Sequence, residues 1–243
     1  MNDEKKDNTL VVGGMHGSGR NAARKFYQAG HKVIIVDKRE KAEDGDNDFY
    51  DLSIATDLTQ EKDIKATIAK IKKRVSAVSN MVFTTKYRGP EDTLWENEIK
   101  LGLTATKMFI DGLSPLMQER GGAIVLISST AARLITNGCS MAYHIVKAGV
   151  EQMTRYYAYN LGCKKIRVNG VAPGYIVKDE SIDYFNSNKK EAEEVAKMHP
   201  LKRYGRADDV ANTVVFLCSK EASFISGQVI TVDGGLSLQN PGF

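Results

Sequence analysis

The chain has 243 residues, of which 42% are hydrophobic, and this is enough to bury one sizeable core. Its formal net charge of +4 comes from interspersed acidic and basic residues, so no nucleic-acid partner is expected. No apolar run approaches the length of a membrane span and the first nine residues lack the apolar centre of a signal peptide, so a cytoplasmic protein without a membrane partner is expected. The three cysteines have neither pair nor metal-site spacing, and no metal is expected.

The N-terminal part reads as a strand, a glycine-rich turn and a helix. The apolar run 10–12 ends in Gly13-Gly14-Met15-His16-Gly17-Ser18-Gly19, and apolar residues then recur at helical spacing as far as Gly30. Such glycines let the backbone approach a pyrophosphate, and the N-terminus of the following helix favours an anion. The pattern predicts a dinucleotide site at Gly13, His16, Gly17, Ser18 and Gly19; a tight turn without a ligand is the alternative.

The next expected strand, 33–36, ends in Asp37, which lies 18 residues beyond Gly19. At this place a dinucleotide-binding fold carries the acid that binds the adenine ribose hydroxyls, and a carboxylate also repels a 2′-phosphate. NAD is therefore favoured as the cofactor. Lys38 and Arg39 follow directly and could partner a phosphate, so NADP is possible.

Asp57 and Leu58 follow the strand expected at 53–56, and we predict that they contact the cofactor. The carboxylate of Asp57 could reach the adenine amino group. Alternatively, Asp57 or Thr59 caps the helix expected from Glu61 to Lys73.

Further strands are expected at 81–83, 123–127, 166–171 and 229–232, with helices at about 95–117 and 140–161. Strands that alternate with helices predict an α/β fold with a doubly wound, seven-stranded parallel sheet, in a single domain of residues 1–243. Ligands of such folds lie beyond the carboxyl ends of the strands. Six segments should converge there, namely 13–19, Asp37, Asp57, 83–87, Ser129 and Pro173-Gly174.

Ser129, Tyr143 and Lys147 could share one site. Tyr143 and Lys147 are four residues apart on an expected helix, which places their Cβ atoms about 5–6 Å apart. An ammonium about 4 Å from the phenol would lower its pKa by about three units at an effective dielectric constant near 20. Tyr143 could then exchange a proton with a substrate oxygen that Ser129 also binds. An exposed stacked Tyr–Lys pair is the alternative.

Together these motifs resemble those of the short-chain dehydrogenase/reductase family over essentially the whole chain. The matching residues are Gly13-x-x-x-Gly17-x-Gly19, Asp37, Asp57, Ser129, Tyr143-x-x-x-Lys147, Asn169, Pro173-Gly174 and the runs 205–211, 226–228 and 233–235. The resemblance implies a Rossmann fold and an alcohol–ketone oxidoreductase that uses NAD or NADP, with Ser129, Tyr143 and Lys147 as catalytic residues. Further cofactor contacts are implied for Thr84, Tyr143, Lys147, Pro173, Gly174 and Ile176. Lys38 is a further candidate contact, from its place directly after Asp37.

The resemblance also implies a homotetramer or homodimer and a substrate lid at about 175–200. The C-terminal run is common among 3-oxoacyl-carrier-protein reductases, so reduction of a 3-oxoacyl thioester is an alternative function. A further alternative is a catalytically impaired dinucleotide-binding protein that acts by association.

Four positions depart from the family pattern. Val12 replaces a Thr whose hydroxyl ties the glycine turn to the next strands, and Phe83-Thr84-Thr85-Lys86 replaces Asn-Asn-Ala-Gly. Gly102 replaces an Asn that holds a water bridging to the catalytic lysine, so we expect a slowed or differently solvated proton relay. Lys178 replaces a Thr that commonly touches the cofactor.

Several cations should border the cleft, namely Lys86, Arg88, Arg133 and Lys178. Clustered cations attract anions, so with Tyr175 at the start of the lid we predict a small polar substrate, either anionic or neutral. Ordinary surface solvation is the alternative for these side chains.

Overall fold

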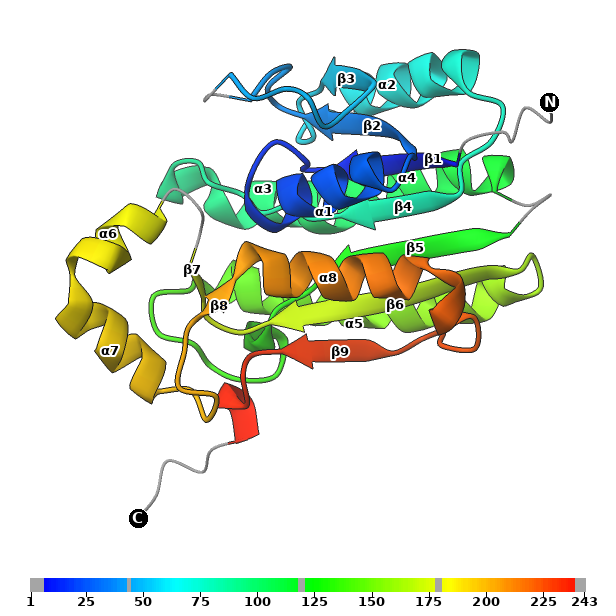
Figure 1. Cartoon of the computed structure of the whole chain (residues 1–243). Helices are drawn as coiled ribbons and strands as arrows, with labels where there is room; N and C mark the ends of the chain where they lie inside the picture. Colours follow the sequence, from blue (N-terminus) through cyan, green and yellow to red (C-terminus); the bar gives the residue numbers. More distant parts are fainter. Residues whose placement is uncertain (1–6, 43–44, 118–120, 178–180, 239–243) are drawn as a thin grey trace.

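The computed structural model describes residues 7–42, 45–117, 121–177 and 181–238, and its centre is a parallel sheet (Figure 1). The sheet has seven strands in the order β3-β2-β1-β4-β5-β6-β9, which confirms the predicted doubly wound fold. The strands are β1 (Asn8–Val12), β2 (Lys32–Asp37), β3 (Leu52–Ala55), β4 (Asn80–Phe83), β5 (Gly122–Ile127), β6 (Ile166–Pro173) and β9 (Val229–Val232). The strand order reverses between β1 and β4, where a ligand crevice is expected.

Helices cover both faces of the sheet and bury it in two apolar cores. On one face lie α1 (Gly17–Gln28) and α8 (Ala207–Cys218); on the other lie α2 (Glu61–Arg74), α3 (Leu94–Ile99), α4 (Ala105–Leu113) and α5 (Met141–Gly162). Along β1, Leu10 and Val12 belong to one core and Val11 to the other. Strands buried on both faces are continuous apolar runs, which is why the sequence predicted them well.

The helix expected at about 95–117 is present, but it is not a regular α-helix throughout. It is divided into α3, a π-helical turn η2 (Lys100–Thr104), α4 and a 3₁₀ turn η3 (Ser114–Leu116). The π turn lies where α5 packs closely: a Cβ on Gly102 would be 2.3 Å from Val146 Cγ1. A π turn places its residues differently around the helix axis, and such turns are frequent at functional sites.

The segment after β6 forms a separate cap beyond the carboxyl ends of the strands (Figure 1). The short strands β7 (Ile176–Val177) and β8 (Gly205–Arg206) pair with each other, and α6 (Ile182–Ser187) and α7 (Lys189–Lys197) lie between them. Val177, Phe185 and Val195 give this cap its own small core. The sequence predicted a lid here but not its two helices.

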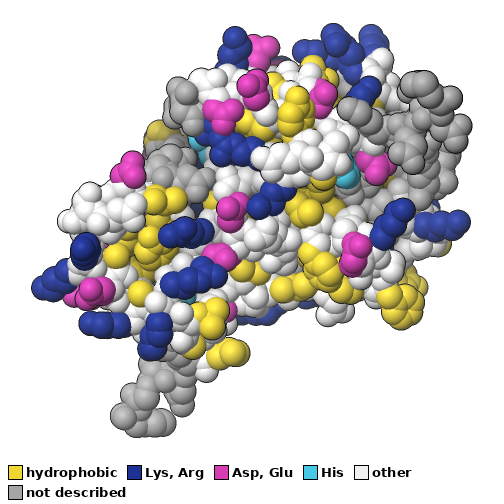
Figure 2. All heavy atoms as spheres, viewed as in Figure 1, with side chains coloured by type: hydrophobic (Ala, Val, Ile, Leu, Met, Phe, Trp, Pro, Cys, Tyr) yellow, Lys and Arg dark blue, Asp and Glu magenta, His cyan; other side chains and the backbone are white. Residues whose placement is uncertain are grey.

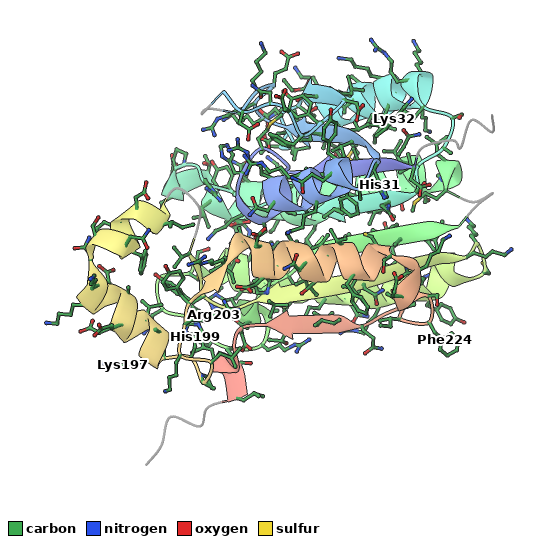
Figure 3. The ribbon with its side chains drawn as sticks, viewed as in Figure 1. His31, Lys32, Lys197, His199, Arg203 and Phe224 are labelled. Carbon is green, nitrogen blue, oxygen red and sulfur yellow. The ribbon has the colours of Figure 1, made fainter. Side chains whose placement is uncertain are left out.

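The end of the cap is attached to the body of the protein (Figure 3). The ring of His199 is 1% exposed and its Nδ1 lies 2.8 Å from the carbonyl oxygen of Val195. Arg203 donates two hydrogen bonds, of 2.7 and 2.8 Å, to the carboxylate of Asp209 on α8. The Arg203–Asp209 bonds link the end of the cap to α8.

The remaining described turns are η1 (Glu91–Thr93), η4 (Thr130–Ala132), η6 (Lys220–Ala222) and η7 (Leu236–Leu238). Lysine and arginine side chains are interspersed with acidic ones on the face covered by α1 and α8 (Figure 2). Among the described helices, none is both long and apolar enough to cross a membrane.

Candidate active site

The glycine turn between β1 and α1 forms a cradle at the carboxyl end of the sheet. Gly13 and Gly17 have φ angles of +87° and +50°, which side chains rarely adopt, and a Cβ on Gly19 would lie 2.4 Å from the carbonyl oxygen of Gly13. Within the described residues, no side-chain hydrogen bond caps α1 and no acidic residue lies in its first turn. The cradle therefore presents helix N–H groups and a positive dipole end, a donor set that fits a pyrophosphate.

Thr84 supplies the hydroxyl that Val12 lacks. Its Oγ1 lies 2.7 Å from the carbonyl oxygen of Gly13, to which it donates, and 3.3 Å from that of Val12. On the other side, the Gly13 N–H donates to the carbonyl of Val36 at 2.8 Å. The glycine turn is thus fixed to the ends of both neighbouring strands, β4 and β2.

Asp37 lies against the same cradle. Its Oδ2 accepts a hydrogen bond from the Met15 N–H at 3.1 Å, and its Oδ1 accepts one from the Arg39 N–H at 3.4 Å. The guanidinium of Arg39 contacts the His16 ring. The structure therefore brings the predicted ribose-binding acid and a cation to the same end of the cradle.

Asp57 closes a turn at the end of β3. Its Oδ1 accepts hydrogen bonds from the N–H and the hydroxyl of Thr59, at 2.9 and 2.7 Å. Partial burial raises the pKa of Asp57, but these bonds and the charge of Lys38 outweigh it, so the pKa lies below its ordinary value.

The capping alternative for Asp57 and Thr59 is wrong. The N-cap of α2 is Gln60, which makes no side-chain capping bond, because Asp57 and Thr59 bond to each other before the helix begins. The neighbouring Leu58 is 6% exposed and packs in the core.

Ser129, Tyr143 and Lys147 converge beyond the end of β5. Ser140 Oγ accepts a hydrogen bond from the Tyr143 N–H at 3.1 Å and so caps α5 at its first turn. Lys147 is 4% exposed, and its Nζ donates to the carbonyl oxygens of Ile127 and Thr85 at 2.9 and 3.3 Å. The Tyr143 side chain makes a hydrogen bond with that of Ser129. The alternative of an exposed stacked Tyr–Lys pair is therefore wrong.

The expected effect of Lys147 on the phenol is also wrong in this structure. Burial raises the pKa of Tyr143, and nearby Cys139 and Glu98 add to the rise, although the hydrogen bond with Ser129 opposes it. Burial likewise lowers the pKa of Lys147 to about 8. The ammonium lies 5.5 Å from the centroid of the phenol ring and donates to backbone carbonyls, so desolvation dominates both groups.

Two charged residues next to Tyr143 were missed by the sequence analysis in this role. Lys86 Nζ lies 4.6 Å from the centroid of the Tyr143 ring. Glu98, on α3, is 3% exposed and accepts a hydrogen bond from the backbone N–H of Tyr87.

The predicted substrate cations are dispersed. Arg133 Nε donates to Glu151 Oε2 at 3.1 Å, so its guanidinium already has a carboxylate partner. Arg88 is exposed, and Tyr175 is 45% exposed at the start of the cap. Lys178 lies outside the described residues.

Pro173, Gly174 and Ile176 lie at the end of β6 and the start of the cap. The Gly174 N–H donates to the carbonyl oxygen of Val232 at 3.0 Å. A Cβ on Gly174 would lie 2.6 Å from Asp233 Cβ, so this position admits only glycine without a shift. The segment is therefore held beside the carboxyl end of β9.

Comparison with known proteins agrees with this geometry. A family model described as "Enoyl-(Acyl carrier protein) reductase" matches residues 13–237. The 3-oxoacyl-[acyl-carrier-protein] reductase of Rickettsia felis is 33% identical over 94% of this chain and 95% of its own. The 7alpha-hydroxysteroid dehydrogenase of Bacteroides fragilis is 30% identical over 96% of this chain and 95% of its own. The aldohexose dehydrogenase structure from Thermoplasma acidophilum has a TM-score of 0.83 at 29% identity and covers 98% of this chain and 96% of its own.

The chain belongs to the short-chain dehydrogenase/reductase family. It is an oxidoreductase that acts on the CH–OH/C=O pair, and its family uses NAD or NADP.

Proposed function

We propose that this oxidoreductase uses Tyr143 as the acid/base group. In this proposal Ser129 orients the substrate oxygen, and the Lys147 ammonium places a positive charge near the phenol. The observation that carries this proposal is the convergence of the three side chains beside the glycine cradle. They come from the end of β5 and from α5, and Lys147 is fixed by two carbonyl oxygens at the ends of β5 and β4.

The cradle and the segments around it have the donors and the open backbone that a nicotinamide dinucleotide requires. We propose that Gly13, Gly17, Ser18 and Gly19 hold its pyrophosphate, Asp37 its adenine ribose, and Pro173, Gly174 and Ile176 its nicotinamide end. When bound, the dinucleotide donates or accepts the hydride. Asp37 favours NAD, because its carboxylate would repel a 2′-phosphate.

The protonation state of Tyr143 indicates which proton transfer is easier. Because burial raises the pKa of Tyr143, the phenol keeps its proton at neutral pH. A neutral phenol donates a hydrogen bond and then a proton to a carbonyl oxygen, and Ser129 would bind the same oxygen. This supports reduction of a ketone as the easier direction near neutral pH.

A substitution at Tyr143 tests the proposal. Tyr143→Phe removes the transferable proton, and we expect turnover to fall about 10²–10⁴-fold, the usual contribution of a positioned acid/base, while dinucleotide affinity stays within a few-fold. Tyr27→Phe is the matched control, because Tyr27 is 40% exposed on α1, away from the three catalytic residues, and the variant should retain full activity.

The assay should measure oxidation of NADH and NADPH in separate series, with neutral ketones, 3-oxo acids, aldoses and a short 3-oxoacyl thioester. NADH should be the better reductant. Near-full activity of the Tyr143→Phe protein would remove the phenol from the reaction. Tight NADH binding by the wild type with no oxidation by any compound would favour an association role instead.

The substrate proposal is a small polar molecule with an anionic group. It is supported by Lys86, whose Nζ lies 4.6 Å from the centroid of the Tyr143 ring. By their names, the relatives act on 3-oxoacyl groups carried by a protein, on steroids or on sugars. Their resemblance therefore supports the 3-oxoacyl thioester no more than the other substrates. A preference for 3-oxo acids over neutral ketones would support the anionic class.

A further inference from the structure

Arg133 and Glu151 form an ion pair that the proposed reaction does not use. Arg133 Nε donates to Glu151 Oε2 at 3.1 Å, and Arg133 Nη1 lies 3.5 Å from Thr231 Oγ1 on β9. Glu151 is 6% exposed, and its other carboxylate oxygen, Oε1, has no hydrogen-bond partner within the part of the chain that the structure describes. A buried carboxylate is costly without its cation, so the pair holds Arg133 firmly against α5.

Arg133 ends the short turn that begins at Ser129. Ser129 is the N-cap of η4 and Arg133 is its C-cap, and the Arg133 N–H donates to the carbonyl oxygen of Thr130 at 3.0 Å. The Ser129 Oγ accepts a hydrogen bond from the Ala131 N–H at 3.2 Å. That bond restricts the direction of the hydroxyl, whose own hydrogen remains available to donate. An anchor at Arg133 therefore acts on the Ser129 hydroxyl through one short turn.

The residue before Ser129 is anchored on the same helix. The Ser128 hydroxyl donates to the carbonyl oxygen of Lys147 at 3.0 Å. Lys147 and Glu151 lie four and eight residues beyond Tyr143 on α5, so these three residues lie along one side of the helix. The segment that carries Ser129 is therefore tied to α5 on both sides, by Ser128 before it and by the ion pair after it.

We propose that Arg133 and Glu151 are positioning residues for the reaction: their ion pair holds the η4 turn against α5 and so fixes the Ser129 hydroxyl relative to the Tyr143 phenol. This inference rests on the proposed roles of Ser129 and Tyr143. It gives Arg133 a different role from the substrate contact expected from the sequence, because its guanidinium already bonds a carboxylate.

A double-mutant cycle with Ser129→Ala tests whether the pair acts through Ser129. Arg133→Met/Glu151→Met removes the ion pair and leaves no buried charge without a partner, so the protein should fold. We expect kcat to fall about 10²-fold, the cost of displacing a reacting group by about 1 Å, while NADH affinity stays within a few-fold. When Ser129→Ala is already present, the same double change should alter kcat by less than about twofold. Glu151→Gln keeps the shape of the side chain but not its charge, and should show smaller effects in the same direction should the double variant not fold.

Arg167→Met is the matched control for a purely structural arginine. The Arg167 guanidinium donates to the carbonyl oxygens of Leu217 and Ser219 at 2.7 and 3.0 Å, but it lies near the start of β6, at the end of the strand remote from the site. This variant should be less stable in urea without a loss of kcat. If removal of the Arg133–Glu151 pair lowers kcat by the same factor with and without the Ser129 hydroxyl, the pair acts by general packing and the proposal is overturned.

A second measurement does not depend on turnover. Hydrogen–deuterium exchange of the peptide that covers residues 129–134 reports on the N–H groups of residues 131 and 133, which are bonded within η4. Exchange there should be faster in Arg133→Met/Glu151→Met and unchanged in Arg167→Met. Unchanged exchange in the double variant would overturn the inference. Faster exchange, in a protein whose wild type turns over no substrate, would instead refute the proposed function and leave the anchoring of the turn in place.

Discussion

At the scale of single residues, the site is held together by hydrogen bonds that its sequence motifs do not contain. Thr84 is the clearest case. Val12 leaves the glycine turn without a hydroxyl of its own, and Thr84 supplies one from the adjacent strand end at 2.7 Å from the Gly13 carbonyl. The substitution at one position is thus compensated at another, 72 residues away along the chain.

Thr84→Val tests this compensation. The variant keeps the shape of the side chain but leaves the Gly13 carbonyl without its donor, so we expect the free energy of unfolding to fall by about 1 kcal/mol. Dinucleotide affinity should fall several-fold, because the turn that presents the N–H groups loses its bond to Thr84 and keeps only the Gly13 bond to Val36.

Urea unfolding and calorimetric titration with NADH would measure the two effects. Thr85→Val is the matched control, since the Thr85 hydroxyl makes only a long bond of 3.4 Å to the Leu101 carbonyl. Equal effects of the two variants would contradict the role of Thr84.

The sequence predicted which residues lie close together, but it did not predict the direction of their pKa shifts. The spacing of Tyr143 and Lys147 predicted their proximity, because helix geometry is local. It did not predict that burial would raise one pKa and lower the other, since desolvation depends on the whole fold. Glu98 was missed for the same reason: a glutamate on a helix is normally exposed, and only packing against α5 buries it.

At the scale of elements, the seven strands were predicted and the interrupted helix was not. A buried parallel strand is an apolar run that can be read locally. The π turn at Lys100–Thr104 lies in contact with α5, so the local sequence pattern does not predict it. The segment that forms α8 was noted only as part of the family's C-terminal motif. Helices α6 and α7 have only six and nine residues and few apolar ones, so they were not recognised as helices.

Gly102→Ala measures how tightly the π turn and α5 are packed. Alanine normally stabilises a helix by up to about 1 kcal/mol relative to glycine. Here the added methyl would overlap with Val146, and overpacking typically costs about 1–3 kcal/mol, so we expect net destabilisation.

The double variant Gly102→Ala/Val146→Ala removes the overlap. Its loss of stability should be smaller than the sum of the two single losses by at least about 1 kcal/mol. Thermal and urea unfolding of the three variants would measure this coupling. If the two single losses of stability add up to the loss in the double variant, the side chains at 102 and 146 do not overlap.

At the scale of the whole molecule, we propose that the protein assembles through α5. Tyr156 and Tyr159 lie on one side of this helix and are 61% and 88% exposed, so two aromatic rings face outward together. Apolar surface of this kind is stabilised when a second copy covers it.

Light scattering should therefore give a mass of two or four times 26.8 kDa. Tyr159→Glu should reduce it, because a carboxylate would be buried in the contact, whereas Tyr27→Glu on α1 should not. A monomeric wild type would refute the assembly.

The short pair β7–β8 bears on how members of this family can diverge. Ile176 pairs with Gly205 and Val177 with Arg206, so the two ends of the cap lie side by side where they join the rest of the protein. The part of the cap between β7 and β8 can therefore change in length or sequence during evolution without changing the register of the large sheet. New substrate preferences can thus arise through changes in the cap, while Ser129, Tyr143 and Lys147 keep their positions.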